Sequence, residues 1–127
     1  MKGNAAAWLD PLDRALVRLE EALNAPKNAF VRDSAIQRFE FTYEPAWKAL
    51  KAFFEDRGIQ VQPFPRDLFR EAFQRGVIAD DPLWMDSIAM RNLTSHTYNE
   101  KTAEDIYARL PALAKLYRSL RERLKKA

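Results

Sequence analysis

Apolar residues recur at intervals of three and four along almost the whole chain, and this spacing constrains the fold more than any other feature. The stretch from about Asn28 to Arg57 shows it best, with Ile36, Phe39, Tyr43, Trp47, Leu50 and Phe54. Because an α-helix has about 3.6 residues per turn, these side chains share one face. Only three glycines occur in 127 residues, too few for a turn-rich β architecture. The sequence therefore predicts an all-α protein.

Helix-start signals divide the chain into about five helices. An acidic residue followed by proline marks two of the starts, at Asp10 and at Asp81. Proline suits a first helical turn, where its missing N–H would have no partner. Pro65 opens a further helix, and the run from Thr102 to Asp105 resembles a capping box at the start of the last one. The expected architecture is an up-and-down helical bundle.

The chain shows no internal repeat, low-complexity linker or domain boundary. A chain of 127 residues is long enough to bury one sizeable core, so we expect a single helical domain over residues 1–127. Residues 1–10 are expected to form a loose lead-in. Pro45 lies inside the long second helix, where proline removes a backbone donor and clashes with the preceding turn, so we expect a kink or a break there.

Composition excludes several kinds of site. The absence of cysteine excludes disulfides, thiolate metal sites and a cysteine nucleophile, and with a single histidine we expect neither a zinc site nor another cofactor. No apolar run approaches the roughly 20 residues of a membrane span. The N-terminus lacks the apolar region of a signal peptide, so we expect a cytoplasmic protein. A net charge of +3 permits contact with nucleic acid without arguing for it.

A polar segment interrupts the apolar pattern near the end of the fourth helix. Residues 91–98 read Arg-Asn-Leu-Thr-Ser-His-Thr-Tyr and hold the only histidine, His96. In a regular helix Arg91 and His96 would point roughly 140° apart, because each residue advances about 100°. Three explanations remain open. The helix unwinds near Ser95, two chains assemble the site together, or the two residues have separate structural tasks such as capping the helix end.

If Arg91 and His96 do converge, the pair suits cleavage of a phosphodiester. Arginine carries a permanent charge and a fork of donors that matches phosphate oxygens. Histidine titrates near neutrality and can act as general base or general acid. In RNA the 2′-hydroxyl is a nucleophile already present in the substrate, so this chemistry needs no metal. Glu40 and Glu44 also have two readings, either a solvated flank with paired charges or a carboxylate that points at a partner.

The run from Arg91 to Glu100 resembles the motif of the HEPN superfamily, in which an arginine and a histidine are separated by a short spacer. More narrowly it is similar to the branch of nucleotidyltransferase substrate-binding proteins, which includes HepT-type toxins. The resemblance covers roughly residues 10–125 and departs from the family pattern at Pro45. Further matching residues are Arg38 to Glu44, Ala46 to Lys48, Pro65, Arg66, Glu71, Ala72, Gly76 to Ile78 and Trp84.

The resemblance implies a homodimeric all-α bundle. Active HEPN proteins are metal-independent ribonucleases whose arginine and histidine meet at the dimer cleft. Carried over, Arg91 would be the phosphate-binding cation, His96 the acid or base, and Asn92 an orienting residue. In the HepT-type branch a minimal nucleotidyltransferase acts as antitoxin and transfers AMP to a tyrosine whose place is occupied here by Tyr98. The added anionic group would exclude RNA.

Two functions of different classes are compatible with these residues, and the absence of any activity is a third possibility. The first is an endoribonuclease toxin subunit of a two-gene toxin–antitoxin module, with RNA as substrate. The second is a non-catalytic subunit that supplies a substrate- or nucleotide-binding surface to a nucleotidyltransferase. The third is a helical dimer without activity. Arg91, His96 and Tyr98 favour the first, because a binding subunit needs no acid or base.

Overall fold

The computed structural model describes residues 4–127, and these residues form five α-helices and one 3₁₀ turn. No strand occurs among them. The prediction of an all-α bundle of about five helices is confirmed. In chain order the elements are α1 (Ala6–Asn24), α2 (Ala29–Asp56), α3 (Pro65–Gln74), α4 (Leu83–Leu93), η1 (Thr94–His96) and α5 (Glu100–Lys126).

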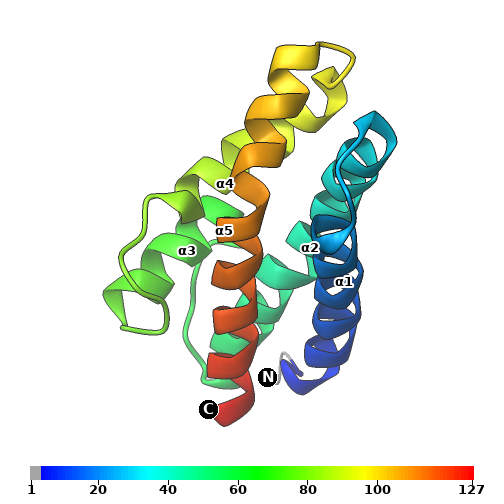
Figure 1. Cartoon of the computed structure of the whole chain (residues 1–127). Helices are drawn as coiled ribbons and strands as arrows, with labels where there is room; N and C mark the ends of the chain where they lie inside the picture. The colour runs from blue at the N-terminus through cyan, green and yellow to red at the C-terminus, as the bar shows by residue number, and fades with distance from the viewer. Residues whose placement is uncertain (1–3) are drawn as a thin grey trace.

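The three long helices α1, α2 and α5 pack against one another, and the shorter α3 and α4 complete the bundle against α2 and α5 (Figure 1). The loop between α1 and α2 lies at the same end of the bundle as the connection between α4 and α5 (Figure 1). The end of α5 lies at the opposite end. The polar segment of residues 91–98 therefore sits at one tip of the bundle, beside the start of α2.

The core is built from the predicted apolar stripes. Ile36, Phe39, Tyr43, Leu50 and Phe54 of α2 are all buried, as the spacing predicted. Fully burying one such side chain contributes roughly 1.5–3 kcal/mol. The other helices contribute large side chains that are equally inaccessible, among them Leu12, Leu16, Leu19, Leu68, Phe69, Ile106, Leu110, Leu113 and Tyr117.

Ion pairs tie the helices together around this core. Arg118 of α5 lies 2.6 Å from Glu20 of α1 and also pairs with Asp13. The hydrogen bond from Arg118 lowers the pKa of the Asp13 carboxyl. Arg109 of α5 pairs with Asp86 of α4 at 2.5 Å. None of the helices within residues 4–127 is long and apolar enough to cross a bilayer.

The predicted start of the first helix was wrong. Helix α1 begins at Ala6, so the expected loose lead-in is helical over its last five residues, and only residues 1–3 of it lie outside the described chain. Two contacts explain the early start. The carboxylate of Asp56 accepts hydrogen bonds from the backbone N–H groups of Asn4 and Ala5, at 2.7 and 2.9 Å. Trp8 also packs against the core. These contacts offset the hydrogen bond that Pro11 cannot make inside the helix.

Proline does not break the second helix either. Helix α2 continues through Pro45, so of the expected kink or break the break does not occur. Pro45 is itself buried, and Tyr43 and Ala46 on either side of it are buried in the core. The packing of this face offsets the one backbone hydrogen bond that proline removes. In the same way α5 runs unbroken through Pro111.

The predicted capping box at the start of the last helix was also wrong. Helix α5 begins at Glu100, and the side chain of Asn99 accepts a hydrogen bond from the backbone N–H of Thr102 at 3.1 Å. Asn28 caps α2 in the same way, with 2.8 Å to the N–H of Val31. Asparagine is among the preferred N-cap residues because its short side chain reaches these free donors. Thr102 thus donates through its backbone instead of capping through its hydroxyl.

Replacing the cap gives a direct check on this start. We expect Asn99→Ala to lower the free energy of unfolding by about 1 kcal/mol, because one backbone donor of α5 loses its partner. Urea unfolding followed by circular dichroism measures this. Thr102→Ala is the matched control and should change the stability by less than about 0.5 kcal/mol. A larger loss of stability for Thr102→Ala than for Asn99→Ala would instead support the capping box predicted from Thr102 to Asp105.

Candidate functional site

The connection between α4 and α5, residues 91–100, is called the α4–α5 junction below. Helix α4 stops at Leu93, and Thr94–His96 form a 3₁₀ turn, so the helix does unwind near Ser95, which was one of the three explanations left open. Hydroxyl groups help to end the helix. The Thr94 hydroxyl donates to the Arg91 carbonyl at 2.7 Å, and the Thr97 hydroxyl donates to the Thr94 carbonyl at 3.4 Å. Such local bonds compete with the backbone ladder of a regular helix.

Arg91 faces inward, toward α2. Its Nη1 lies 3.6 Å from Oε2 of Glu40 and donates to the Thr94 hydroxyl at 3.3 Å. The side chains of Arg91 and Glu40 are each little more than a third exposed. The buried phenol of Tyr43 lies close by. Burial raises the pKa of Tyr43 to about 12, the charge of Glu44 adds to this, and the charge of Arg91 acts against it. Arg91 is thus a half-buried cation with one carboxylate partner.

His96 and Tyr98 face solvent and contact each other. The Tyr98 hydroxyl lies 3.5 Å from Nδ1 of His96, and the two rings meet edge to face with their centroids 6.0 Å apart. Tyr98 is 83% exposed. Because α4 stops at Leu93, Tyr98 does not continue the helical face of Arg91.

One chain does not bring the predicted catalytic pair together. Across the described residues, no hydrogen bond or ion pair joins Arg91 to His96. A 3₁₀ turn advances about 120° per residue, so tightening the helix does not rotate His96 onto the face of Arg91. Asn92 lies on the exposed side of α4, where its carbonyl accepts a long 3.5 Å bond from the Ser95 hydroxyl.

The structure adds Glu40 to the site. The sequence left open whether Glu40 and Glu44 form a solvated flank or point at a partner. Glu44 does pair with Lys48 one turn away, at 3.7 Å, as a flank residue does. Glu40 instead contacts Arg91 across the boundary between α2 and α4. Sequence spacing alone could not say which of the two glutamates faces α4.

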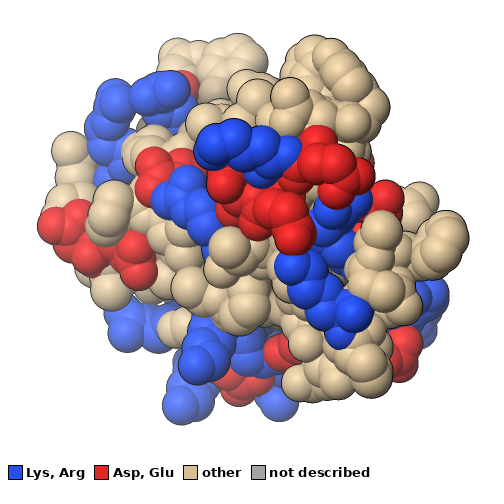
Figure 2. Space-filling model, turned by 45° about the horizontal axis from the view of Figure 1, so that its top comes forward, with Lys and Arg blue, Asp and Glu red and all other residues tan. Residues whose placement is uncertain are grey.

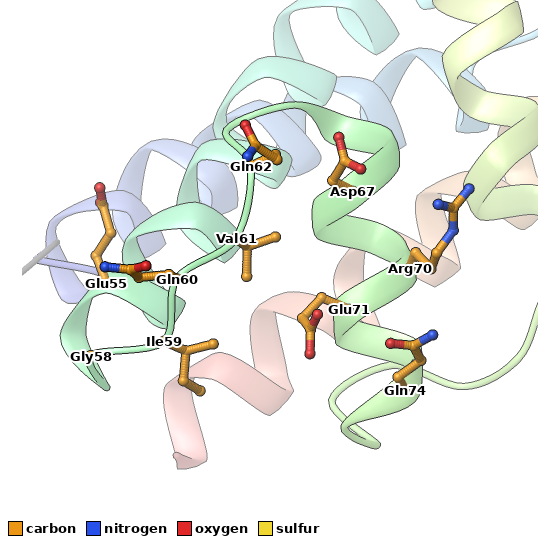
Figure 3. A pocket seen from close by; sticks show the side chains of 10 residues that line it. All are labelled: Glu55, Gly58, Ile59, Gln60, Val61, Gln62, Asp67, Arg70, Glu71 and Gln74. Carbon is orange, nitrogen blue, oxygen red and sulfur yellow. The ribbon is translucent and has the colours of Figure 1, made fainter.

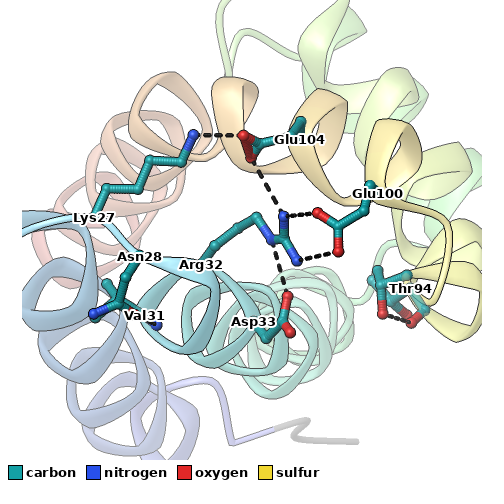
Figure 4. Close-up of polar contacts among 9 residues, drawn as sticks. Lys27, Asn28, Val31, Arg32, Asp33, Thr94, Glu100 and Glu104 are labelled. Atoms are coloured by element: carbon teal, nitrogen blue, oxygen red, sulfur yellow. Dashed lines mark hydrogen bonds and ion pairs between the residues drawn. The ribbon is translucent and has the colours of Figure 1, made fainter.

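The structure also adds Arg32 and Glu100, which our sequence analysis did not propose as functional (Figure 4). Arg32 is only 5% exposed and binds both carboxylate oxygens of Glu100, at 2.6 and 3.4 Å. That hydrogen bonding lowers the pKa of Glu100 and raises the pKa of Arg32. The sequence did indicate that Arg32 is buried, because Arg32 lies four residues before Ile36 and extends the buried stripe of α2 by one turn.

A groove of about 790 Å³ opens away from the junction (Figure 3). It lies between the end of α2, the loop after Gly58 and α3, with Glu55, Asp67 and Glu71 on its walls. None of the junction residues lines it. Over residues 4–127 we find no group of three or more histidine, aspartate or glutamate side chains placed to hold a metal ion. The candidate site is therefore the exposed surface of the junction.

The chain is similar to known sequences and solved structures over most of its length. A family model described as nucleotidyltransferase substrate binding protein like matches residues 8–126. A relative from Haemophilus influenzae, named "Probable ribonuclease HepT", is 34% identical, and the match covers 80% of this chain and 81% of that protein.

Two solved structures share the fold. A protein of Thermus thermophilus superposes with a TM-score of 0.83 at 38% identity, over 89% of this chain and 98% of its own. A Haemophilus influenzae protein superposes with a TM-score of 0.79 at 28% identity, over 92% of this chain and 98% of its own. The latter structure is described as revealing the fold of a substrate binding domain of a nucleotidyltransferase.

Removing the Glu40 carboxylate should free Arg91. An ion pair of this exposure contributes roughly 0.2–1 kcal/mol, so we expect Glu40→Gln to speed modification of Arg91 by phenylglyoxal up to about fivefold. Peptide mass spectrometry measures the rate at this one position. Glu44→Gln is the matched control, because Glu44 pairs with Lys48. Equal rates in the wild type and in Glu40→Gln would show that the pair does not hold Arg91 in solution.

Proposed function

Because the chain belongs to the nucleotidyltransferase substrate-binding-protein-like family, we propose that it is the HEPN-type subunit of a two-gene toxin–antitoxin module. In this proposal it is a metal-independent endoribonuclease, and a minimal nucleotidyltransferase neutralises it by adenylylating Tyr98. One observation carries the proposal: residues 91–98 present a cation, an imidazole and a solvent-exposed tyrosine on one tip of the bundle. The family relative named as a ribonuclease supports it.

The proposed reaction is transfer of the phosphoryl group within the RNA. His96 accepts the proton of the 2′-hydroxyl, whose oxygen attacks the adjacent phosphorus. The bond between phosphorus and the 5′ oxygen breaks, and a protonated imidazole gives the leaving oxygen its proton. The products are a 2′,3′-cyclic phosphate and a 5′-hydroxyl. Arg91 stabilises the negative charge on the phosphoryl oxygens, and Asn92 orients the group.

We propose that two chains complete this site. Within one chain Arg91 faces α2 while His96 faces solvent, so a second copy has to supply the opposing group. Exposed apolar side chains near the junction support such a contact. Phe41 is 41% exposed and follows Glu40, and Leu93 is 45% exposed and ends α4. In a two-fold dimer the two copies of His96 divide the roles of base and acid.

The exposure of Tyr98 supports it as the proposed modification site. The chain has four tyrosines. Tyr43 and Tyr117 are buried, Tyr107 is half-buried, and Tyr98 is 83% exposed. A transferase has to bring the α-phosphorus of ATP to the phenol oxygen, which only an exposed hydroxyl permits. An adenylyl group on Tyr98 would place a negative charge beside His96, because the unmodified hydroxyl lies 3.5 Å from its Nδ1.

A non-catalytic subunit is the alternative, and one observation favours it. The half-buried Arg91 already has a carboxylate partner in Glu40, which weakens a single chain as a phosphate site. A surface that presents Tyr98 or binds a nucleotide for a nucleotidyltransferase needs no acid or base. RNA cleavage separates the two functions, since a binding subunit does not cut RNA at any concentration.

Purified chain, free of its partner, should cleave RNA in EDTA and leave 2′,3′-cyclic phosphate ends. We expect His96→Ala to lower the rate by at least about a hundredfold, because general acid–base catalysis contributes roughly 10²–10⁴-fold. Denaturing gels and mass spectrometry of the products measure rate and end groups. Ser95→Ala, a neighbouring exposed change, should keep most of the activity. Full activity in a folded His96→Ala protein would place the chemistry elsewhere.

Incubation with the partner nucleotidyltransferase and ATP should raise the intact mass by AMP units, and peptide mapping should locate them on Tyr98. Tyr98→Phe should abolish the increase, because the phenol oxygen is the proposed acceptor. Tyr107→Phe is the matched control and should be labelled like the wild type. Labelling of Tyr98→Phe to the wild-type extent would exclude Tyr98 as the acceptor.

A further inference from the structure

We infer that Arg32 is a positioning residue for His96 and Tyr98 and that it acts through the carboxylate of Glu100. The inference rests on the proposed function for its catalytic consequence, while its structural part concerns only this chain. Arg32 lies near the start of α2, and Glu100 is the first residue of α5. The two are separated by 68 residues in sequence. Their contact therefore joins the start of one long helix to the start of another, beside the exposed site.

The guanidinium of Arg32 is buried and fully engaged (Figure 4). Nη1 and Nη2 bind the two oxygens of Glu100, at 2.6 and 3.4 Å, and Nε binds Asp33 at 3.0 Å. Glu104 lies 3.8 Å away and is itself held by Lys27 at 2.6 Å. A guanidinium that binds both oxygens of a carboxylate fixes the plane of that carboxylate as well as its position.

The bound carboxylate is unusual in being exposed. The side chain of Glu100 is 78% exposed, whereas that of Arg32 is 6% exposed. Figure 2, with this tip of the bundle turned forward, shows acidic side chains gathered in the middle of the view with lysine and arginine around them. A glutamate on such a surface is ordinarily mobile. Arg32 reaches out of the protein interior and holds this one in a single place.

A short stretch of backbone links Glu100 to the site. Tyr98 precedes Glu100 by two residues, and Asn99 lies between them. The N–H of Asn99 donates to the carbonyl of His96 at 3.1 Å, and its side chain caps α5. A shift of the first turn of α5 is therefore transmitted to His96 and Tyr98, because Asn99 is hydrogen-bonded both to that turn and to the carbonyl of His96.

The junction is held at its other end as well. Thr94 is 7% exposed, and its hydroxyl donates a hydrogen bond to the backbone carbonyl of Arg91. The side chain of Arg91 is in turn paired with Glu40. Residues 95–99 thus lie between two contacts with α2, one through Arg91 and one through Glu100. The contact through Glu100 follows His96 and Tyr98 in the chain, whereas the contact through Arg91 precedes them. Weakening the contact through Glu100 should loosen these two side chains while leaving Arg91 in place.

Nuclear magnetic resonance tests the structural part without any assay of activity. His96 is the only histidine, so its imidazole signals need no assignment among several. In the wild type we expect a nuclear Overhauser effect between the rings of His96 and Tyr98. Arg32→Lys and Glu100→Gln should weaken it and shift both sets of ring signals. Lysine keeps the charge of Arg32 but lacks the fork that binds both oxygens.

Lys101→Met is the matched control. Lys101 pairs with Asp105 at 2.8 Å near the start of α5, and both side chains are exposed. This variant removes a charge pair of the tip without touching Arg32, so its ring signals should match those of the wild type. Arg32 is buried, so replacing it can disturb the packing around it. Glu100→Gln avoids this, because it leaves the guanidinium of Arg32 and its other partners in place.

Kinetics test the catalytic part. Misplacing a catalytic group by about 1 Å can cost roughly a hundredfold in rate, so we expect Glu100→Gln to lower kcat by at least about tenfold. KM should stay within about twofold, since Arg91 keeps its place and charge. The exchange Arg32→Glu with Glu100→Arg should recover part of kcat if the contact itself is what matters.

The outcomes separate the inference from the proposed function. Unchanged ring signals in folded Arg32→Lys and Glu100→Gln would overturn the positioning role, whatever the activity. A second outcome is that the wild type shows the ring contact, the variants lose it, and the wild type cuts no RNA. That outcome would support the positioning role and refute the nuclease activity. A change of KM with kcat intact would contradict the role assigned to Glu100 and indicate instead a direct contact with substrate.

Discussion

Burial of one face of α2 is the constraint on which the rest of the structure depends. Phe39, Leu50 and Phe54 on that face lie in the common core, and α2 contacts every other helix of the bundle. The rigid helix also carries the two residues that hold the α4–α5 junction, Arg32 and Glu40. They are eight residues apart, which is about 12 Å along a helix. The spacing of the two anchors of the candidate site is therefore fixed by the element that the core holds most firmly.

This arrangement explains why an exposed turn can carry ordered groups. Turns at the tips of bundles are commonly mobile because few contacts hold them. Here the junction is short, its hydroxyls bond to its own carbonyls, and α2 binds it on both sides through Glu40 and Arg32. The tip is held by two charge pairs, one through the buried Arg32 of α2 and one between the half-buried Glu40 and Arg91.

Much of the fold could be predicted from the sequence, because apolar periodicity reports directly on which face of a helix is buried. The stripe of α2 was predicted, whereas unwinding near Ser95 was one of three explanations that the sequence left open. The start of α5 was missed although its Asn99 cap is local. The start of α1 was missed because it depends on a tertiary contact. Asp56 reaches the start of α1 from 51 residues away. Proline in α2 was tolerated for the same reason, since packing outweighs one lost hydrogen bond.

The candidate site was only partly predictable. Its motif is local, so Arg91, Asn92, His96 and Tyr98 could be named from one short run. The partners of that run come from α2, and nothing in the sequence spacing pairs Glu40 with Arg91 rather than with solvent.

The geometry also constrains how activity and regulation relate. The hydroxyl proposed for modification and the imidazole proposed for catalysis lie 3.5 Å apart on one turn. A group added to Tyr98 therefore acts on His96 directly, without a conformational change elsewhere. Arg91 is different, because it faces α2 and is already paired with Glu40. A phosphate that approaches Arg91 has to compete with Glu40, whereas an adenylyl group on Tyr98 meets no such competitor. The switch therefore bears first on the acid–base step of the proposed reaction and only then on phosphate binding.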